Sequence, residues 1–316
     1  METDIKILIE KFIAQKQYAE DRSKTTMLNY HWVFKKMLQL MPEIMTTRDL
    51  SRDNVVEFLK RLDERMRVVG INKVHGISSS TKRTYISKLN TFCEWLCDNG
   101  CIVNNPITNK KLKRPKIVDG DKKYLNIYEL ERILLAIAHN IIWENNFIKT
   151  RNELIIVLSF TCCLRRSELL GLLISDLDLD NSMLTVRGNT SKSKKTRHVP
   201  INSWCMDKLK IYLVERSKKH YKNPYLFVAN RVDRSFTTHG LKHITCKIEK
   251  ASGINFHMHQ LRHTGAYVMK KNNVNTSSIQ NVLGHSDLKN TQVYLSGFPE
   301  TENRKYIEGI TLQNLR

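Results

Sequence analysis

The sequence has no hydrophobic run long enough to cross a bilayer. Its longest apolar stretch, residues 154–164, is far shorter than the roughly 20 residues that a spanning helix needs. The first residues do not show a basic segment followed by an apolar one, the pattern of a secretory signal, and no lipidation motif is present. We therefore expect a cytoplasmic protein that does not bind a membrane.

The residues that several kinds of chemistry require are also absent. Asp and Glu form no cluster with the spacing of metal ligands, which argues against catalysis by two metal ions. No Gly-rich phosphate-binding loop of the GxxxxGKS/T type occurs. The seven cysteines are an odd number, typical of reduced thiols, and Cys93, Cys97 and Cys101 match no common zinc spacing. The sequence therefore predicts neither a metal nor a cofactor.

Positive charge is what the sequence has in excess. It contains 52 Lys and Arg against 31 Asp and Glu, a formal net charge of +21. Residues 1–120 carry +8 and residues 121–316 carry +13, so both parts are basic. A basic tail would have placed the charge at one end of the chain. Two basic regions instead suit a protein in which both regions bind the same polyanion. Nucleic acid is the favoured partner.

Residues 1–107 are predicted to form a helical domain. Apolar residues recur every three or four positions from Ile5 to Ala14 and over residues 25–40. A third helix is expected to begin at Ser51, and a fourth, capped by Ser80, to end at Asn99-Gly100. The intervening residues 69–80 are rich in Gly and Ser and predict a loop.

Residues 108–122 have the composition of a basic linker, with Pro and Gly among Lys and Arg. Such a segment would be ordered by following a phosphate backbone. The candidate DNA-binding residues come from this linker and from the last helix before it: Lys82, Arg83, Lys88, Lys113 and Arg114. For the three on the helix, an ordinary solvated helix face is an equally good interpretation.

Residues 123–316 are predicted to form a second domain, mostly helical with one small antiparallel sheet, so that the whole chain is mainly α. Asn126 is the expected N-cap of its first helix. Two helices are expected within residues 152–172, and further helices over 204–217 and 239–251. Residues 176–187 and 197–201 predict a turn into a strand and its partner.

Residues suited to phosphate chemistry gather between His257 and Tyr294. His259 and Arg262 are three residues apart, so a helix would place them on one face. Gly284 indicates a helix C-terminus that turns His285 outward. Taken singly, each of these residues is more often structural than catalytic. Together, a His, an Arg, a second His and a lone Tyr suit an anionic phosphate attacked by a phenol.

Two further places in the chain add charge of the same kind. At residues 164–169, Leu-Arg-Arg-Ser-Glu-Leu, a charged pair interrupts an otherwise apolar helix. Residues 186–200 form a basic loop between β-rich flanks, which would place Lys192 at the tip of a hairpin. Glu168 lies one helical turn from Arg165 and either holds the side chains of that region or pairs with Arg165 or Arg166 on the surface.

In this order the motifs resemble those of the tyrosine recombinases, or phage-type integrases. The family pattern is Leu-Arg-x-Ser-Glu-Leu, a hairpin lysine, His-x-Leu-Arg-His, Leu-Gly-His and a nucleophilic Tyr nine residues on. The resemblance assigns the catalytic set to Arg165, Lys192, His259, Arg262, His285 and Tyr294. Cys163 stands where the family usually has Gly. Lys194 and Lys195 are alternatives to Lys192.

The resemblance implies a site-specific recombinase or integrase that cuts and rejoins double-stranded DNA through a 3′-phosphotyrosyl intermediate, without metal or ATP. It also implies that residues 1–107 close over one side of the DNA. Four protomers would hold two DNA sites, and the apolar pattern within residues 295–316 predicts that this segment docks on a neighbouring protomer. Service to a mobile element and service to chromosome segregation both remain open.

Three alternatives compete with this interpretation. A type IB topoisomerase would use the same nucleophile but relax supercoils without exchanging strands. A DNA-binding protein with a decayed catalytic site is disfavoured because the set of six residues is complete. A histidine phosphatase is suggested by Arg262-His263, but in that class the motif lies at a first strand near the N-terminus.

Overall fold

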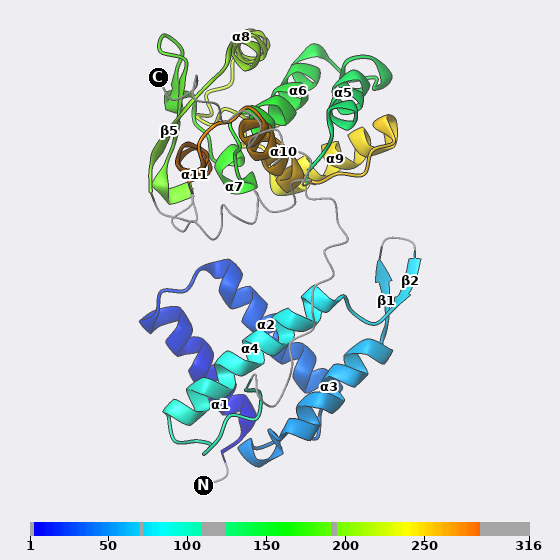
Figure 1. The fold of residues 1–316 in the computed structure, drawn as a ribbon, viewed down its shortest axis with the longest axis vertical. Helices are drawn as coiled ribbons and strands as arrows, with labels where there is room; N and C mark the ends of the chain where they lie inside the picture. Colours follow the sequence, from blue (N-terminus) through cyan, green and yellow to red (C-terminus); the bar gives the residue numbers. More distant parts are fainter. Residues whose placement is uncertain (1–2, 70–71, 109–123, 191–194, 285–316) are drawn as a thin grey trace, which may run out of the picture. The chain divides into compact units, whose positions relative to one another are not determined.

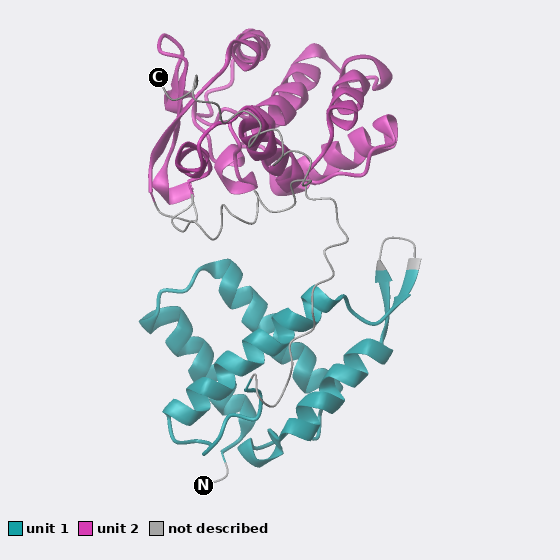
Figure 2. Ribbon diagram, viewed as in Figure 1, with its two compact units in different colours: residues 1–120 teal, residues 121–316 magenta. Residues whose placement is uncertain are grey.

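The computed structural model describes residues 3–69, 72–108, 124–190 and 195–284 (Figure 1). The chain divides into two compact units, residues 1–120 and residues 121–316 (Figure 2). Within the described residues, no helix combines the length and the apolar character that crossing a membrane requires.

Among its described residues, the N-terminal unit has four α-helices around one core. They are α1 (Ile5–Ala14), α2 (Lys24–Leu40), α3 (Arg52–Glu64) and α4 (Ser79–Asp98). A serine side chain caps α2, α3 and α4 in turn, which satisfies a backbone N–H at each helix start. For α4 the cap is Ser78 and not the predicted Ser80, because the Ser78 Oγ accepts from the backbone N–H of Thr81 at 3.2 Å.

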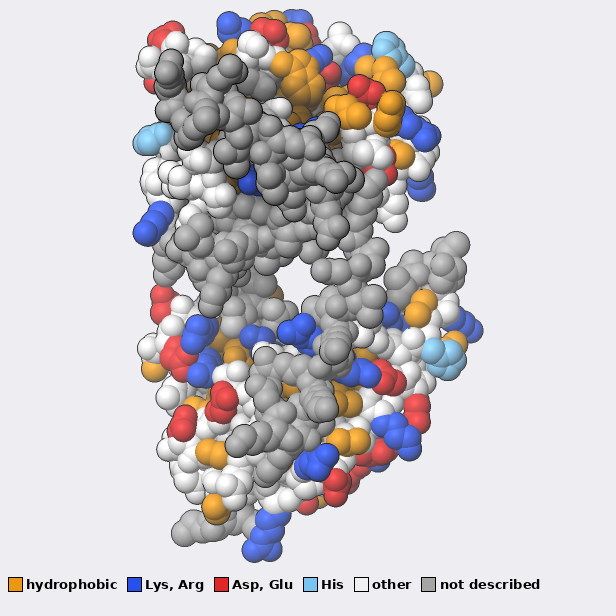
Figure 3. All heavy atoms as spheres, in the orientation of Figure 1, with side chains coloured by type: hydrophobic (Ala, Val, Ile, Leu, Met, Phe, Trp, Pro, Cys, Tyr) orange, Lys and Arg blue, Asp and Glu red, His pale blue; other side chains and the backbone are white. Residues whose placement is uncertain are grey.

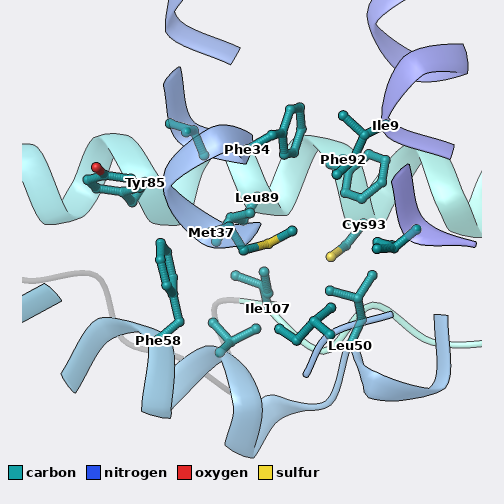
Figure 4. Close-up of a cluster of buried hydrophobic side chains, with 14 of the residues drawn as sticks. Ile9, Phe34, Met37, Leu50, Phe58, Tyr85, Leu89, Phe92, Cys93 and Ile107 are labelled. Atoms are coloured by element: carbon teal, nitrogen blue, oxygen red, sulfur yellow. The ribbon is translucent and has the colours of Figure 1, made fainter. Parts of the chain in front are cut away.

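Aromatic side chains fill the centre of this unit. Phe12 of α1 makes edge-to-face contacts with Phe34 of α2 and with Phe92 of α4, at ring-centroid distances of 5.8 and 5.2 Å. Figure 4 shows Phe34, Phe92 and their aliphatic neighbours packed between the helices. Burying such large rings is the main source of stability for a small helical unit.

A short β-hairpin lies between α3 and α4, where the sequence predicted a loop. Its strands β1 (Met66–Val69) and β2 (Asn72–His75) pair antiparallel, with Arg67 opposite Val74. The predicted loop over residues 69–80 was wrong at β2 because that prediction relied on the Gly and Ser content. Valines on both strands favour extended backbone, and the prediction overlooked that signal.

The C-terminal unit holds seven helices and a three-stranded sheet among its described residues. The helices are α5 (Ile127–Leu135), α6 (Asn146–Thr161), α7 (Arg166–Leu170), α8 (Ser203–Ser217), α9 (Thr238–Ser252), α10 (Met258–Lys271) and α11 (Thr276–Leu283). The antiparallel strands run in the order β3 (Leu177–Asp178), β4 (Met183–Val186), β5 (Arg197–Pro200). Single π-helical turns follow α1 and α5 over Gln15–Ala19 and Ala136–Asn140. The mainly α fold with a small antiparallel sheet is confirmed.

Helix α6 is the centre of this unit. It begins at Asn146, capped by Asn145, and not at the predicted Asn152. The run from Leu154 to Leu158 is completely buried, and α6 packs against α8 and α10. Gly265 of α10 lies so close to α6 that a β-carbon there would be 2.1 Å from the carbonyl oxygen of Phe160. This close approach places the middle of α10 beside the end of α6, where the candidate site lies.

Candidate active site

The bend between α6 and α7 presents Arg165. Cys163, in this bend, has a φ of 52°, in the left-handed region that glycine adopts without strain. This backbone conformation accounts for the Gly that the family pattern has at this position. Arg165 is the N-cap of α7, and its backbone N–H donates to the Oε2 of Glu168 at 2.8 Å. The Leu-Arg-x-Ser-Glu-Leu motif is therefore a capped helix start.

Glu168 is the centre of an arginine cluster. Its side chain is fully buried, and its Oε1 accepts from the Nη1 atoms of Arg165 and Arg197 at 2.7 and 3.1 Å. Its Oε2 accepts from the Nη2 of Arg197 at 2.9 Å and lies 3.6 Å from the Nη1 of Arg262. Burial raises the pKa of Glu168, but the hydrogen bonds and charge of Arg197 and the hydrogen bonds of Arg165 outweigh it and bring this pKa to about 2. The carboxylate is therefore ionised throughout the neutral range.

The same three arginines bind the C-terminal end of α11. Helix α11 ends at Gly284, whose φ of 61° is left-handed, and the last carbonyls of a helix lack partners within it. Each of three consecutive carbonyl oxygens accepts from a different arginine: Val282 from Arg197 Nε at 2.8 Å, Leu283 from Arg262 Nη2 at 2.7 Å and Gly284 from Arg165 Nη2 at 3.3 Å. The cations also stabilise the negative end of the helix dipole. The backbone directly before His285 is thus fixed by the cluster.

Helix α10 contributes Arg262 and His259. His257 caps it, with Nδ1 accepting from the backbone N–H of Gln260 at 3.1 Å, so His257 has a structural task. Arg262 is fully buried and its Nη1 donates to the carbonyl of Cys163 at 2.7 Å. Burial and then the charge of Arg262 lower the pKa of His259, and the charge of Arg165 adds to this. The pKa of His259 therefore lies below the ordinary 6.5, which favours the neutral imidazole at pH 7.

The structure brings together the predicted residues Arg165, His259 and Arg262, which come from two different segments of the chain. Lys192, Lys194, His285 and Tyr294 lie outside the described residues. Lys195 is described and exposed. No group of three or more His, Cys, Asp or Glu within the described ranges is placed to hold a metal ion.

Arg197 was not among the residues predicted for the site. The sequence interpretation treated it as one residue of the basic loop at the start of a strand. Alternate residues of a strand face the same side, and Arg197 shares its side of β5 with Val199, which is buried. A charged side chain on the apolar face of a strand requires a buried partner. That pattern is the signal that would have identified Arg197.

The predicted DNA-binding residues of α4 have different surroundings. Lys82 forms an ion pair with Asp63, and the ammonium of Lys88 lies 4.3 Å from the ring centroid of Tyr30. Arg83 is partly exposed. Figure 3 shows other Lys and Arg side chains on the drawn face of the N-terminal unit, interspersed with Asp and Glu. Lys113 and Arg114 lie outside the described residues.

Glu168 gives the stability of the protein a defined pH dependence. Its folded-state pKa of about 2 is below the ordinary 4.5, so its contribution is complete above pH 4.5 and is lost as the pH falls towards 2. The difference corresponds to about 3 kcal/mol. We expect Glu168→Gln to reduce the loss in free energy of unfolding between pH 7 and pH 3, measured by urea denaturation.

The control for this experiment is Glu215→Gln. Glu215 pairs with Lys218 on the surface of α8, and such pairs contribute little. This variant should keep the acid sensitivity of the wild type. If Glu168→Gln also keeps it, the ionised Glu168 is not a source of acid sensitivity.

The chain matches the Phage integrase family over residues 123–300. It is 33% identical over 187 residues to the tyrosine recombinase XerA of Thermococcus kodakarensis, an alignment that spans 58% of this chain and 62% of that protein. With XerA of Thermococcus onnurineus the identity is 33% over 208 residues, spanning 64% and 69%. XerC of Listeria innocua is 27% identical over 259 residues, spanning 78% and 81%.

Solved structures share the fold. The Tn1549 transposon integrase in complex with a circular intermediate DNA superimposes with a TM-score of 0.75 at 18% identity, covering 96% of this chain and 99% of that one. The XerH site-specific recombinase in a post-cleavage complex with a palindromic difH substrate gives a TM-score of 0.69 at 23% identity, covering 90% and 79%.

Proposed function

The chain belongs to the Phage integrase family of tyrosine recombinases, and from this premise we propose that it is a site-specific DNA recombinase that cuts and rejoins strands through a 3′-phosphotyrosyl intermediate. The observation that carries the proposal is the convergence of Arg165 and Arg262 on Glu168 and on the end of α11, next to His259 in α10. Two guanidiniums held in one place match the charge and the geometry of a phosphodiester.

The proposed reaction begins when the phenol oxygen of Tyr294 attacks phosphorus and the bond to the 5′-oxygen breaks. A free phenol has a pKa of about 10, so Tyr294 needs a base, and His259 or His285 takes its proton. Arg165 and Arg262 stabilise the charge that grows on the non-bridging oxygens. The tyrosyl–phosphate ester conserves the energy of the broken phosphodiester bond. A 5′-hydroxyl from another strand can therefore attack this ester and reverse the step without ATP.

The proposed partner is double-stranded DNA, and both units would contact it. Residues 1–107 would form the domain that closes over DNA, with Lys82, Arg83 and Lys88 as contacts. Residues 108–122 would form the basic linker, which contributes Lys113 and Arg114. Residues 123–316 would form the catalytic domain. Solved relatives of the same fold are complexes with DNA, which supports this partner. We further propose that the enzyme acts in the cytoplasm as four protomers on two sites, joined through residues 295–316.

The function is tested by trapping the protein on DNA. The protein is mixed with fragments of its host's DNA, denatured, and the covalently attached fragments are sequenced. We expect the attached fragments to share one recurring sequence, joined to the protein through a 3′-phosphate. The covalent complex should form equally well in EDTA, because arginines supply the positive charge. Activity that a divalent ion specifically restores would contradict the mechanism. Supercoil relaxation without strand exchange between two such sites would favour a type IB topoisomerase.

Lys192 is proposed as the acid that protonates the leaving 5′-oxygen, since an alkoxide leaves poorly. A sulfur in place of that oxygen leaves without protonation, because a thiol has a pKa of about 8.5. Sulfur-substituted DNA should therefore restore cleavage to Lys192→Ala, and should not rescue Arg165→Ala, whose defect lies at the non-bridging oxygens. If sulfur-substituted DNA instead restores cleavage to Lys194→Ala or Lys195→Ala, that lysine is the acid. If no lysine variant responds, the hairpin does not supply the acid.

A further inference from the structure

Arg197 joins three elements of the C-terminal unit at one point. It is the first residue of β5, and only 10% of its side chain is exposed. It makes two hydrogen bonds to Glu168 of α7 and one to the carbonyl of Val282 in α11. Gly284 lies against it, since a β-carbon at Gly284 would be 2.8 Å from the Arg197 Nη1.

The hydrogen bonds of Arg197 complete the shell around the Glu168 carboxylate. A carboxylate has about four acceptor positions. Here Oε1 accepts from the Nη1 atoms of Arg165 and Arg197, and Oε2 accepts from the backbone N–H of Arg165 and the Nη2 of Arg197. The Nη1 of Arg262 lies 3.6 Å from Oε2, beyond hydrogen-bond distance, and donates to the carbonyl of Cys163. Arg197 therefore occupies half of the acceptor capacity.

We propose that Arg197 is a positioning residue for strand cleavage: by occupying both oxygens of Glu168, it keeps Arg262 from bonding to that carboxylate and in place for the phosphate. This role rests on the proposed function, which assigns the phosphate to Arg262. Without Arg197, a buried anion would have two empty acceptor positions beside a buried cation. Arg262 would need to move by only about 1 Å to reach the length of a charge-assisted bond. A displacement of about 1 Å in a reacting group costs about 100-fold in rate.

The first test is Arg197→Met, which keeps an unbranched apolar side chain and removes the guanidinium. We expect covalent-complex formation to slow about 100-fold under single-turnover conditions, with DNA affinity essentially unchanged. A crystal structure of the variant should show Arg262 Nη1 within hydrogen-bond distance of Glu168 Oε2, against 3.6 Å in the unaltered protein. An unchanged distance, or an unchanged rate, would overturn the proposal.

The second test removes the anion as well. In a Glu168→Gln background the neutral amide no longer attracts Arg262, so adding Arg197→Met should slow cleavage less than about threefold. The pair of substitutions also removes both partners of a buried ion pair, which a fold tolerates better than the loss of one. This comparison therefore stands even where Arg197→Met alone does not fold. A double variant tenfold slower than Glu168→Gln would show that Arg197 acts by another route.

Arg187→Met is the matched control. Arg187 directly follows β4, whose last residue pairs with Arg197, and it binds the buried carboxylate of Asp176 at 3.0 Å and the carbonyl of Gly171. Its removal breaks a comparable ion pair without touching Glu168. We expect a similar fall in the melting temperature and no change in cleavage rate. If Arg187→Met slows cleavage as much as Arg197→Met does, the stability of the β4–β5 hairpin explains the effect and the positioning role is refuted.

Failure of the proposed function is separable from failure of this inference. A wild-type protein that forms no covalent complex with DNA would contradict the recombinase assignment. The distance between Arg262 and Glu168 in the Arg197→Met crystal structure would still decide whether Arg197 keeps these two side chains apart.

Discussion

Tyr294→Phe should abolish the covalent protein–DNA complex and leave DNA affinity unchanged. The substitution removes one oxygen, the proposed nucleophile, and keeps the ring, so binding contacts made by the rest of the protein persist. Covalent catalysis needs that nucleophilic atom. The measurement is a denaturing gel of labelled DNA carrying the target site, beside a binding titration under native conditions.

Tyr128→Phe is the control for this prediction. Tyr128 lies on α5 of the same unit and its side chain is 73% exposed, so it is accessible to DNA added in solution. This variant should form the adduct at the wild-type rate. A denaturant-resistant complex that persists in Tyr294→Phe would mean that another residue is the nucleophile.

Arg165→Ala should lower the rate of cleavage about 1000-fold. Removing one donor that stabilises charge in a transition state costs about 100-fold to 1000-fold, and a guanidinium lies at the upper end because it supplies both charge and paired hydrogen bonds. The fold should persist, because Glu168 keeps both bonds from Arg197 and the backbone N–H of residue 165. The rate is measured from covalent-complex formation in a single turnover.

Arg166→Ala is the matched control for Arg165→Ala. The two arginines are neighbours, but Arg166 is exposed on α7 while Arg165 contacts Glu168 and the carbonyl of Gly284. Both substitutions remove the same charge from the same region. If both slow cleavage equally, net charge near the DNA explains the effect. If only Arg166→Ala slows it, the motif has been assigned in the wrong register.

The sequence predicted the helices of both units because a helix depends on the spacing and type of residues that are close together in the chain. Apolar residues at intervals of three and four positions identified α1 and α2, and Asn126 was correctly identified as the cap of α5. The errors were local too. Valines that favour a strand were overlooked in β2, and the cap of α4 was placed two residues late, since several serines in a row offer the same signal.

The sequence by itself determined which residue types are candidates for the site and in which order they occur. Arg165 was expected at a helix junction, and His259 and Arg262 on one helix face, because spacing along the chain sets both. Only the tertiary structure decided what these residues bind. Cys163 and Arg262 are 99 positions apart, and their hydrogen bond depends on how closely α10 lies against α6 at Gly265.

The tertiary structure also decided the place of Arg197 and the state of Glu168. In the sequence, Glu168 was equally compatible with a surface ion pair, and Arg197 was one basic residue among many in a loop. Folding buries the carboxylate and surrounds it with guanidiniums from β5, α7 and α10. A buried charge is stable only when partners satisfy it, and those partners come from distant segments. Local pattern therefore identifies the charged residues, while packing alone determines which charges meet.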